Sequence, residues 1–270
     1  MSGVDQKLLK QLHIACEFGN ELKVREWLIG TTCVDSVDQS CWNETALHAA
    51  CRGENCNIVE LLLAHGANLE VRGWNGWTPL HYAAVHMKLD IVKLLLDRGA
   101  EINARDIHGS TALYKVVSDA AIVKELLARG AIVNSNEKTN PWPLLHTAAR
   151  DGSLESVRLL LAAGANVHAR SRFGGQTALD VARSRAKFVP SGSAIAQCLE
   201  EAVARSWSKE VHRDYLHIAI ALAPLNLPTY ILLWLLDWLP EFALKPEIKK
   251  IRLLERIYES RRRRMLEHRE

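Results

Sequence analysis

The 270-residue sequence lacks the short motifs that mark most enzymes and metal proteins. It contains no Gly-x-Gly-x-x-Gly or Walker loop, no His-Glu-x-x-His and no Gly-x-Ser-x-Gly. Its six cysteines form no Cys-x-x-Cys pair, and its first 20 residues hold no apolar core of signal-peptide length. We therefore expect a non-secreted chain with reduced thiols, no enzyme activity, no cofactor, no metal site and no small-molecule substrate.

The sequence also has little net charge, with 34 Lys and Arg residues against 31 Asp and Glu residues. Residues 241–270 hold 10 of the basic and 6 of the acidic residues, so residues 1–240 are close to neutral. Nonspecific affinity for nucleic acid comes from a basic surface that contacts many phosphates. We expect the main body of the chain not to bind nucleic acid.

The sequence is dominated by a repeat of about 33 residues. Thr-Ala-Leu-His at 45–48 is followed by Thr-Pro-Leu-His at 78–81 and Thr-Ala-Leu-Tyr at 111–114. Related tetrapeptides occur at 143–146 and 177–180, and Gln-Leu-His at 11–13 opens the series. The second half of each unit repeats as well: Ile-Val-x-Leu-Leu-Leu-x-x-Gly-Ala occurs at 58–67 and 91–100, and shorter copies at 123–131 and 157–165.

These motifs resemble the ankyrin-repeat family over residues 5–205. The resemblance implies an all-α ankyrin-repeat solenoid of about six helix-turn-helix units with extended hairpin tips and atypical end repeats. Residues 206–270 would then be a helical C-terminal module with a basic tail. A glycine follows each second helix, where a left-handed cap favours this residue. These glycines are Gly66, Gly99, Gly130 and Gly164.

One histidine per repeat invites a metal interpretation. His48, His81 and His146 would lie about 10 Å apart in stacked repeats, whereas zinc needs several ligands at about 2.1 Å from one ion. We therefore interpret them as structural residues that bond neighbouring turns. Repeat four departs from the pattern, because Tyr114 replaces the histidine and the following turn is shorter. Repeat six carries an insert at 186–193 between its helices.

The resemblance implies that protein partners bind at the hairpin tips and on the concave face of the first helices. We expect tips at residues 70–77, 103–110, 134–142 and 168–175. The candidate partner-binding residues are the arginines at one shared tip position, Arg72, Arg105 and Arg170, the tip tryptophans Trp74, Trp77 and Trp142, and the concave-face residues Tyr82, His86 and Arg150. Trp42, Phe18, Arg52 and Asp151 are secondary candidates.

The arginines favour an acidic partner through charge-assisted hydrogen bonds. The alternative is that the arginines only solubilise the tips and that the tryptophans pack along the hairpin stems.

A strongly apolar segment at 212–240 follows the repeats. Pro224, Asn226, Pro228 and Asp237 interrupt it, so we expect a buried helix and no transmembrane span. The candidate docking residues are Leu227, Pro228, Leu232, Leu235, Leu236 and Leu239. Their spacing resembles the start of an F-box, and a repeat array before a helical box also resembles the SOCS-box proteins, although no cysteine follows Cys198. Private packing or dimerisation of this helix is the alternative.

The sequence therefore favours a non-catalytic adaptor that recruits a client protein through its repeats. The sharper hypothesis is a substrate receptor of a cullin-type ubiquitin ligase, with a ligase adaptor bound to the C-terminal module. The competing hypothesis is a signalling or transcriptional regulator that masks a partner, with the basic run 261–264 directing it to the nucleus. We expect a cytoplasmic protein under the first hypothesis and a nuclear one under the second.

Overall fold

The computed structural model describes residues 6–30, 34–37, 43–134, 142–172, 174–187 and 191–206. The chain divides into two compact units, Met1–Glu200 and Glu201–Glu270, and residues 201–206 of the second unit are described and helical. The helices of the first unit are α1 (Gln6–Glu17), α2 (Glu21–Gly30), α3 (Ala46–Arg52), α4 (Cys56–Ala64), α5 (Pro79–Val85), α6 (Leu89–Asp97), α7 (Ala112–Lys115), α8 (Ala120–Ala128), α9 (Leu144–Asp151), α10 (Leu154–Ala162) and α11 (Ala178–Ala186), with a short 3-10 helix η2 (Trp74–Gly76). Residues 191–200 are also helical.

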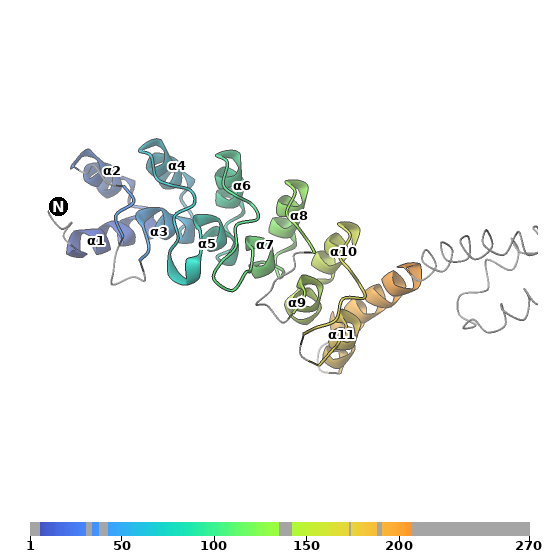
Figure 1. The fold of residues 1–270 in the computed structure, drawn as a ribbon. Helices are drawn as coiled ribbons and strands as arrows, with labels where there is room; N and C mark the ends of the chain where they lie inside the picture. Colours follow the sequence, from blue (N-terminus) through green and yellow to red (C-terminus); the bar gives the residue numbers. More distant parts are fainter. Residues whose placement is uncertain are drawn as a thin grey trace, which may run out of the picture. The chain divides into compact units, whose positions relative to one another are not determined.

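The helices of the first unit lie in two rows (Figure 1). The odd-numbered helices α1 to α11 form one row, which we call the first-helix row, and the even-numbered helices α2 to α10 form the other. Neighbours within a row pack on each other, as α3 does on α5 and α4 on α6. The described residues contain no strand, and an isolated antiparallel bridge joins Arg170 and Thr177. The all-α repeat solenoid predicted from the sequence is confirmed.

Each repeat folds because its apolar residues recur at helical spacing and its helices are capped. The central leucines of the second helices, Leu62, Leu95, Leu126 and Leu160, are fully buried. Thr45 and Thr78 cap the starts of α3 and α5 in a reciprocal arrangement with the histidine three residues on. Since one repeat cannot bury both of its faces, stability comes from stacking.

The predicted histidine role is confirmed. Nε2 of His48 lies 3.1 Å from the backbone carbonyl oxygen of Trp77, and Nε2 of His81 lies 3.1 Å from that of Ser110. His146 makes the matching contact with the Gln176 carbonyl at 2.7 Å. Each histidine therefore ties its own helix to the hairpin that enters the next unit.

A second ladder joins the loops that follow the second helices. In four successive repeats a backbone N–H donates to a side-chain oxygen of the preceding repeat. The pairs are Asn68 to Asp35, Glu101 to Glu70, Ile132 to Asn103 and Asn166 to Asn134, at 2.8–3.2 Å. These bonds fix the register of one repeat on the next.

The predicted glycine caps and irregular repeats are also present. Gly66, Gly99, Gly130 and Gly164 all have φ between 84° and 91°, the left-handed region that disfavours a side chain. Repeat four is shortened in its first helix, because α7 spans only four residues, and not in the following turn, where we expected it: residues 116–119 separate α7 from α8, against 86–88 between α5 and α6. The insert in repeat six is shorter than the sequence suggested, since residues 191–193 already belong to the next helix.

Candidate functional site

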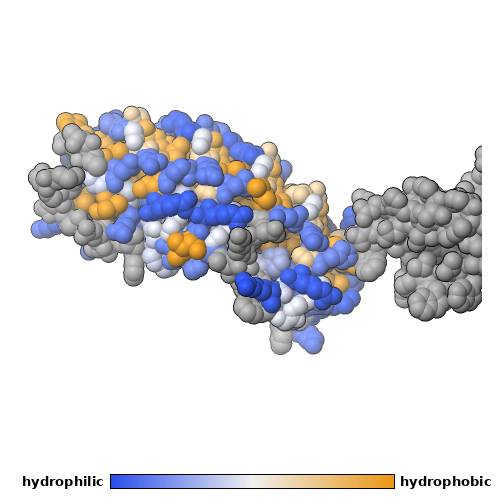
Figure 2. All heavy atoms as spheres, in the orientation of Figure 1, coloured by the Kyte–Doolittle hydropathy of each residue, from blue (hydrophilic) through white to orange (hydrophobic). Residues whose placement is uncertain are grey.

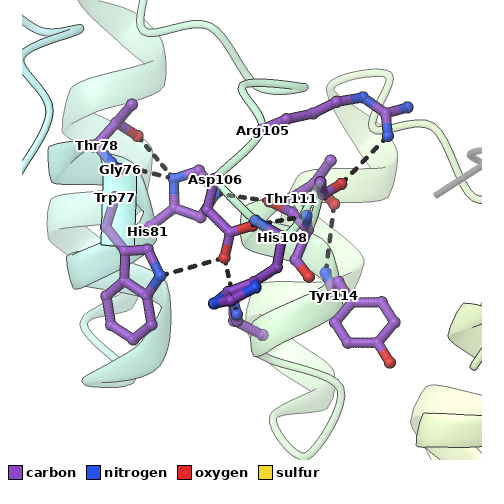
Figure 3. A network of polar contacts seen from close by, with 12 residues as sticks. Gly76, Trp77, Thr78, His81, Arg105, Asp106, His108, Thr111 and Tyr114 are labelled. Atoms are coloured by element: carbon purple, nitrogen blue, oxygen red, sulfur yellow. Dashed lines mark hydrogen bonds and ion pairs between the residues drawn. The ribbon is translucent and has the colours of Figure 1, made fainter. Parts of the chain in front are cut away.

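The hairpin tips of repeats three and four are joined to each other (Figure 3). The backbone N–H of Ile107 donates to the Asn75 carbonyl at 3.0 Å, and the Trp77 indole Nε1 donates to Oδ2 of Asp106 at 3.2 Å. Arg72 adds a third link, because its Nη1 donates to the Arg105 carbonyl at 2.6 Å. These three hydrogen bonds join the two tips into one connected structure.

Asp106 lies at the centre of the hydrogen-bond network of the joined tips. Its Oδ1 accepts the backbone N–H groups of His108 and Ser110, both at 2.8 Å, and Lys115 pairs with Oδ2 at 2.9 Å. The carboxylate is 0% exposed. Burial alone would raise its pKa, but the bonds from Lys115 and the backbone outweigh burial and hold the pKa below its usual value. Asp106 is thus an ionised and fully satisfied group inside the tips.

The three tip arginines that we proposed as partner-binding residues share one local contact. Nη1 of Arg72 donates to the Gly76 carbonyl at 3.1 Å, Nη1 of Arg105 to Gly109 at 3.2 Å, and Nη1 of Arg170 to Gly175 at 2.9 Å. Each guanidinium therefore fastens its own hairpin. Neither interpretation of the sequence included this structural role of the recurring arginines.

The tip tryptophans differ in exposure. Trp74 is 44% exposed and lies at 5.7 Å, centroid to centroid, from the half-buried ring of Trp77. The Lys115 ammonium sits 5.3 Å from the centroid of Trp77, within cation–π range. Trp142 is half-buried and has the Arg150 guanidinium 5.5 Å from its centroid. The stem-packing interpretation thus describes Trp77 better than it describes Trp74.

Tyr82 is not the contact residue that we expected on the concave face. It is only 3% exposed, because its ring packs between His48 at 4.9 Å and Trp77 at 5.4 Å. Its hydroxyl donates to Oε1 of the buried Glu44 at 2.6 Å. Burial raises the pKa of the Tyr82 hydroxyl, and the hydrogen bond to Glu44 raises it further. This corrects the expectation: Tyr82 supports the face and offers it almost no surface.

Arg52 completes a charged cluster beside Tyr82. It pairs with Glu44 on one side and, at 3.4 Å, with Glu17 on the other. His86 is exposed at the end of α5, where burial and the nearby charge of Arg52 lower its pKa. The first-helix row therefore carries cations that the chain itself already neutralises.

Arg150, in α9, is likewise neutralised by a carboxylate of the chain itself. Its Nε and Nη2 both bond Oδ2 of Asp151, at 2.8 and 2.6 Å. The side chain remains exposed and accessible to a partner. Arg150 and His86 are the exposed residues among the three concave-face candidates.

Two apolar side chains stand out on the tips. Ile107 is 64% exposed and occupies the same tip position as Trp74, 33 residues earlier. Ile107 was not among the residues predicted from the sequence, although its equivalence with Trp74 is visible in the repeat. Figure 2 shows hydrophobic residues interspersed among hydrophilic ones over the first unit, with a run of strongly hydrophilic residues across its middle.

Several candidates lie outside the described residues. These are Trp42 and the C-terminal docking residues Leu227, Pro228, Leu232, Leu235, Leu236 and Leu239, together with the basic run 261–264. Within the described ranges, no three His, Cys, Asp or Glu side chains are placed to hold a metal ion. No helix in that part of the chain has the length and apolar character needed to cross a bilayer.

Comparison with known proteins gives one family and several partial relatives. The family model described as ankyrin repeats (3 copies) matches residues 12–106 and 107–189. The tyrosine-protein kinase HTK16 of Hydra vulgaris is 36% identical over 174 residues, which are 64% of this chain and 19% of the kinase. The human NF-kappa-B inhibitor zeta is 28% identical over 153 residues, 53% of this chain and 21% of that protein.

The human ankyrin repeat and SOCS box protein 11 is 38% identical over 74 residues, which are 27% of this chain and 22% of that protein. This similarity covers repeats only. The chain spans about a fifth of the length of each of these relatives.

Proposed function

The chain belongs to the ankyrin-repeat family, and from this we propose that it is a non-catalytic adaptor that binds a client protein through its repeats. The observation that carries the proposal is that different side chains join the repeats to each other and stand exposed at the tips. Histidines, loop oxygens and buried leucines complete the contacts between repeats, while arginine, tryptophan and isoleucine side chains stand exposed at the tips. Arg and Trp are the residue types enriched where proteins bind each other most strongly.

More specifically, we propose that the chain is a substrate receptor of a cullin-type ubiquitin ligase. The support is the F-box-like and SOCS-box-like spacing of Leu227–Leu239 in the sequence, together with the similarity of the repeats to a relative whose name includes a SOCS box. In this scheme the array holds the client and the C-terminal leucines bind the ligase adaptor in the cytoplasm.

The test uses the tagged full-length chain beside a Leu232→Asp/Leu236→Asp variant and a Lys124→Asp variant, whose altered side chain is exposed on α8. Proteins that co-purify are identified by quantitative mass spectrometry. We expect a cullin adaptor with the wild type and with Lys124→Asp but not with the leucine variant, while clients remain with all three. Absence of any cullin adaptor from the wild type would contradict the ligase role.

The second candidate is a regulator that masks a partner in the nucleus. It is supported by the similarity to a relative named as an NF-kappa-B inhibitor and by the basic run 261–264. Deletion of residues 259–270 separates the two candidates, because it relocates a nuclear regulator to the cytoplasm and leaves the location of a cytoplasmic ligase receptor unchanged.

A further inference from the structure

We propose that the joined tips of repeats three and four bind an acidic peptide segment that carries apolar side chains. The proposal rests on the protein-binding function above and assigns to it one surface and one class of partner. We call this surface the tip platform; it consists of Arg72, Trp74, Arg105 and Ile107. It excludes the equivalent tip of repeat six, which carries Arg170.

The tip platform is held rigid before any partner arrives. Three hydrogen bonds cross between its two hairpins, from Ile107 to Asn75, from Trp77 to Asp106 and from Arg72 to Arg105. The contact between the hairpins is close, since a Cβ placed on Gly76 would lie 3.0 Å from Cγ2 of Ile107. A surface that is already ordered loses little conformational entropy on binding, which favours affinity.

The apolar part of the tip platform is the pair Trp74 and Ile107. They occupy equivalent positions in successive hairpins and are 44% and 64% exposed. Successive repeats stack at about 10 Å, and a peptide in the polyproline II conformation has three residues per turn and rises about 3.1 Å per residue. A peptide that crosses both hairpins in this conformation would therefore present apolar side chains about three residues apart on the face toward the platform.

The charge of the tip platform is positive. In the two tips, residues 70–77 and 103–110, the acidic side chains are Glu70, whose Oε1 accepts the backbone N–H of Glu101 at 2.8 Å, and Asp106, which is 0% exposed and paired with Lys115, against the two exposed arginines. Arg72 and Arg105 are exposed, and the carbonyl bonds of their Nη1 atoms fix the direction of each guanidinium. A guanidinium has five N–H donors, so these bonds leave donors for a carboxylate. Acidic side chains of a partner fit this arrangement.

The first-helix row is a less suitable place for the same partner. Arg52 lies between Glu44 and Glu17, and Arg150 is bonded twice by Asp151. An acidic segment would have to displace carboxylates that the chain already provides. Nucleic acid is disfavoured at the tip platform, because binding through phosphates uses many cations and here two arginines flank two apolar side chains.

The test starts from the full-length chain and a phage-displayed library of random 16-residue peptides. A selected sequence is synthesised with a fluorescein label, and its Kd is measured by fluorescence anisotropy. The variants are Arg105→Gln and Ile107→Ser, with Arg170→Gln as matched control, since Arg105 and Arg170 make the same carbonyl bond within their own tips. Circular dichroism and thermal melting show that each variant is folded.

We expect selected peptides rich in Asp and Glu with apolar residues about three apart. Their Kd should rise about tenfold or more in Arg105→Gln and Ile107→Ser, which corresponds to the loss of one charge-assisted hydrogen bond or one buried apolar contact. Arg170→Gln should leave the Kd unchanged. Added salt should weaken binding, since both partners carry charge.

Other outcomes overturn the proposal. Equal loss of affinity in Arg105→Gln and Arg170→Gln would remove the assignment to the tip platform, as would binding that neither variant alters. Selected peptides without acidic enrichment, or equal binding of a labelled single-stranded oligonucleotide, would remove the partner class.

If no peptide is selected although clients co-purify with the full-length chain, the tip platform fails and the adaptor function stands. If clients are also absent, both fail.

Discussion

His48 reaches from one repeat into the next, where its Nε2 lies 3.1 Å from the backbone carbonyl oxygen of Trp77. On the other side of the ring, the backbone N–H of Thr45 donates to Nδ1 at 3.1 Å. One nitrogen must accept and the other must donate, so the fold requires neutral His48 with its proton on Nε2. This geometry makes the stack of repeats sensitive to acid.

The first prediction concerns pH. Burial lowers the pKa of His48 to about 4, although the bond to the Trp77 carbonyl opposes this, and burial also lowers the pKa of His81 and His146. The unfolded chain takes up these protons near pH 6.5, so between pH 6.5 and 4 it binds more protons than the folded chain. The free energy of unfolding is therefore highest above pH 6.5 and falls on acidification, by about 3 kcal/mol for His48 alone.

Urea unfolding at pH 7.5, 6.0 and 5.0 measures this fall. A His48→Gln variant should start less stable at pH 7.5 and lose less stability on acidification than the wild type. A free energy of unfolding that stays constant from pH 7.5 to 5.0 would contradict the role given to the histidines.

The second prediction uses His146, whose cap is incomplete. Repeat five has Pro143 in the cap position, which lacks an N–H, and among the described residues Nδ1 of His146 has no hydrogen-bond partner. Pro143→Thr should restore the reciprocal cap of Thr45 and Thr78 and raise the free energy of unfolding by about 1 kcal/mol. Chemical denaturation measures the gain, which should be smaller in a His146→Ala background, where the Thr hydroxyl can still accept the backbone N–H of residue 146 but the Thr N–H has no imidazole acceptor. An undiminished gain there would show that the bond to His146 is not part of its cause.

The third prediction concerns the contact between the two tips. Gly76 has φ of 71°, and an added Cβ would meet both Cγ2 and the backbone nitrogen of Ile107, at 3.0 and 3.3 Å. Gly76→Ala should therefore cost about 2 kcal/mol, from backbone strain and displacement of Ile107. Gly130→Ala is the control, since φ is 90° but nothing lies within 4 Å of the new atom, and it should cost about 1 kcal/mol. Equal costs in thermal or urea unfolding would mean that the tips do not restrain each other.

The fourth prediction tests the buried charges beside Tyr82. Arg52→Met leaves the Glu44 carboxylate buried, with the Tyr82 hydroxyl still donating to it, and should cost about 3 kcal/mol. Adding Glu44→Gln removes the unpaired charge, so the double variant should recover at least half of that loss. A double variant that is no more stable than Arg52→Met would show that the unpaired charge of Glu44 is not the cause of the loss.

The repeat pattern was enough to predict the helices, the left-handed glycines and the role of the histidines, because all three recur every 33 residues and their chemistry permits few alternatives. The interior of the tips was not predictable in the same way. The network around Asp106 depends on Trp77, which lies 29 residues away, and on Lys115 from the following helix. Asp106 and Lys115 have no counterpart in the neighbouring repeats, so no recurrence in the sequence relates them to Trp77.

Exposure was the other quantity that the sequence did not contain. Tyr82 and Trp74 both belonged to the candidate contact residues, yet Glu44 and two aromatic rings enclose Tyr82 while Trp74 stays on the surface. The sequence does not distinguish Ile107 from a core residue, because isoleucine is among the residue types most often buried. Its exposure follows from its place beyond the helices, at the end of a hairpin.

Photo-crosslinking by the full-length protein in cells tests the role of the joined tips most directly. A benzophenone amino acid replaces Ile107 at the tip platform in one variant and Lys124, exposed on α8, in a control. We expect protein adducts from position 107 that are absent from position 124, and these adducts should diminish when Arg105→Gln is added. Adducts from position 124 alone, or the same adducts from both positions, would contradict the claim that the joined tips are the surface on which this protein binds its partner.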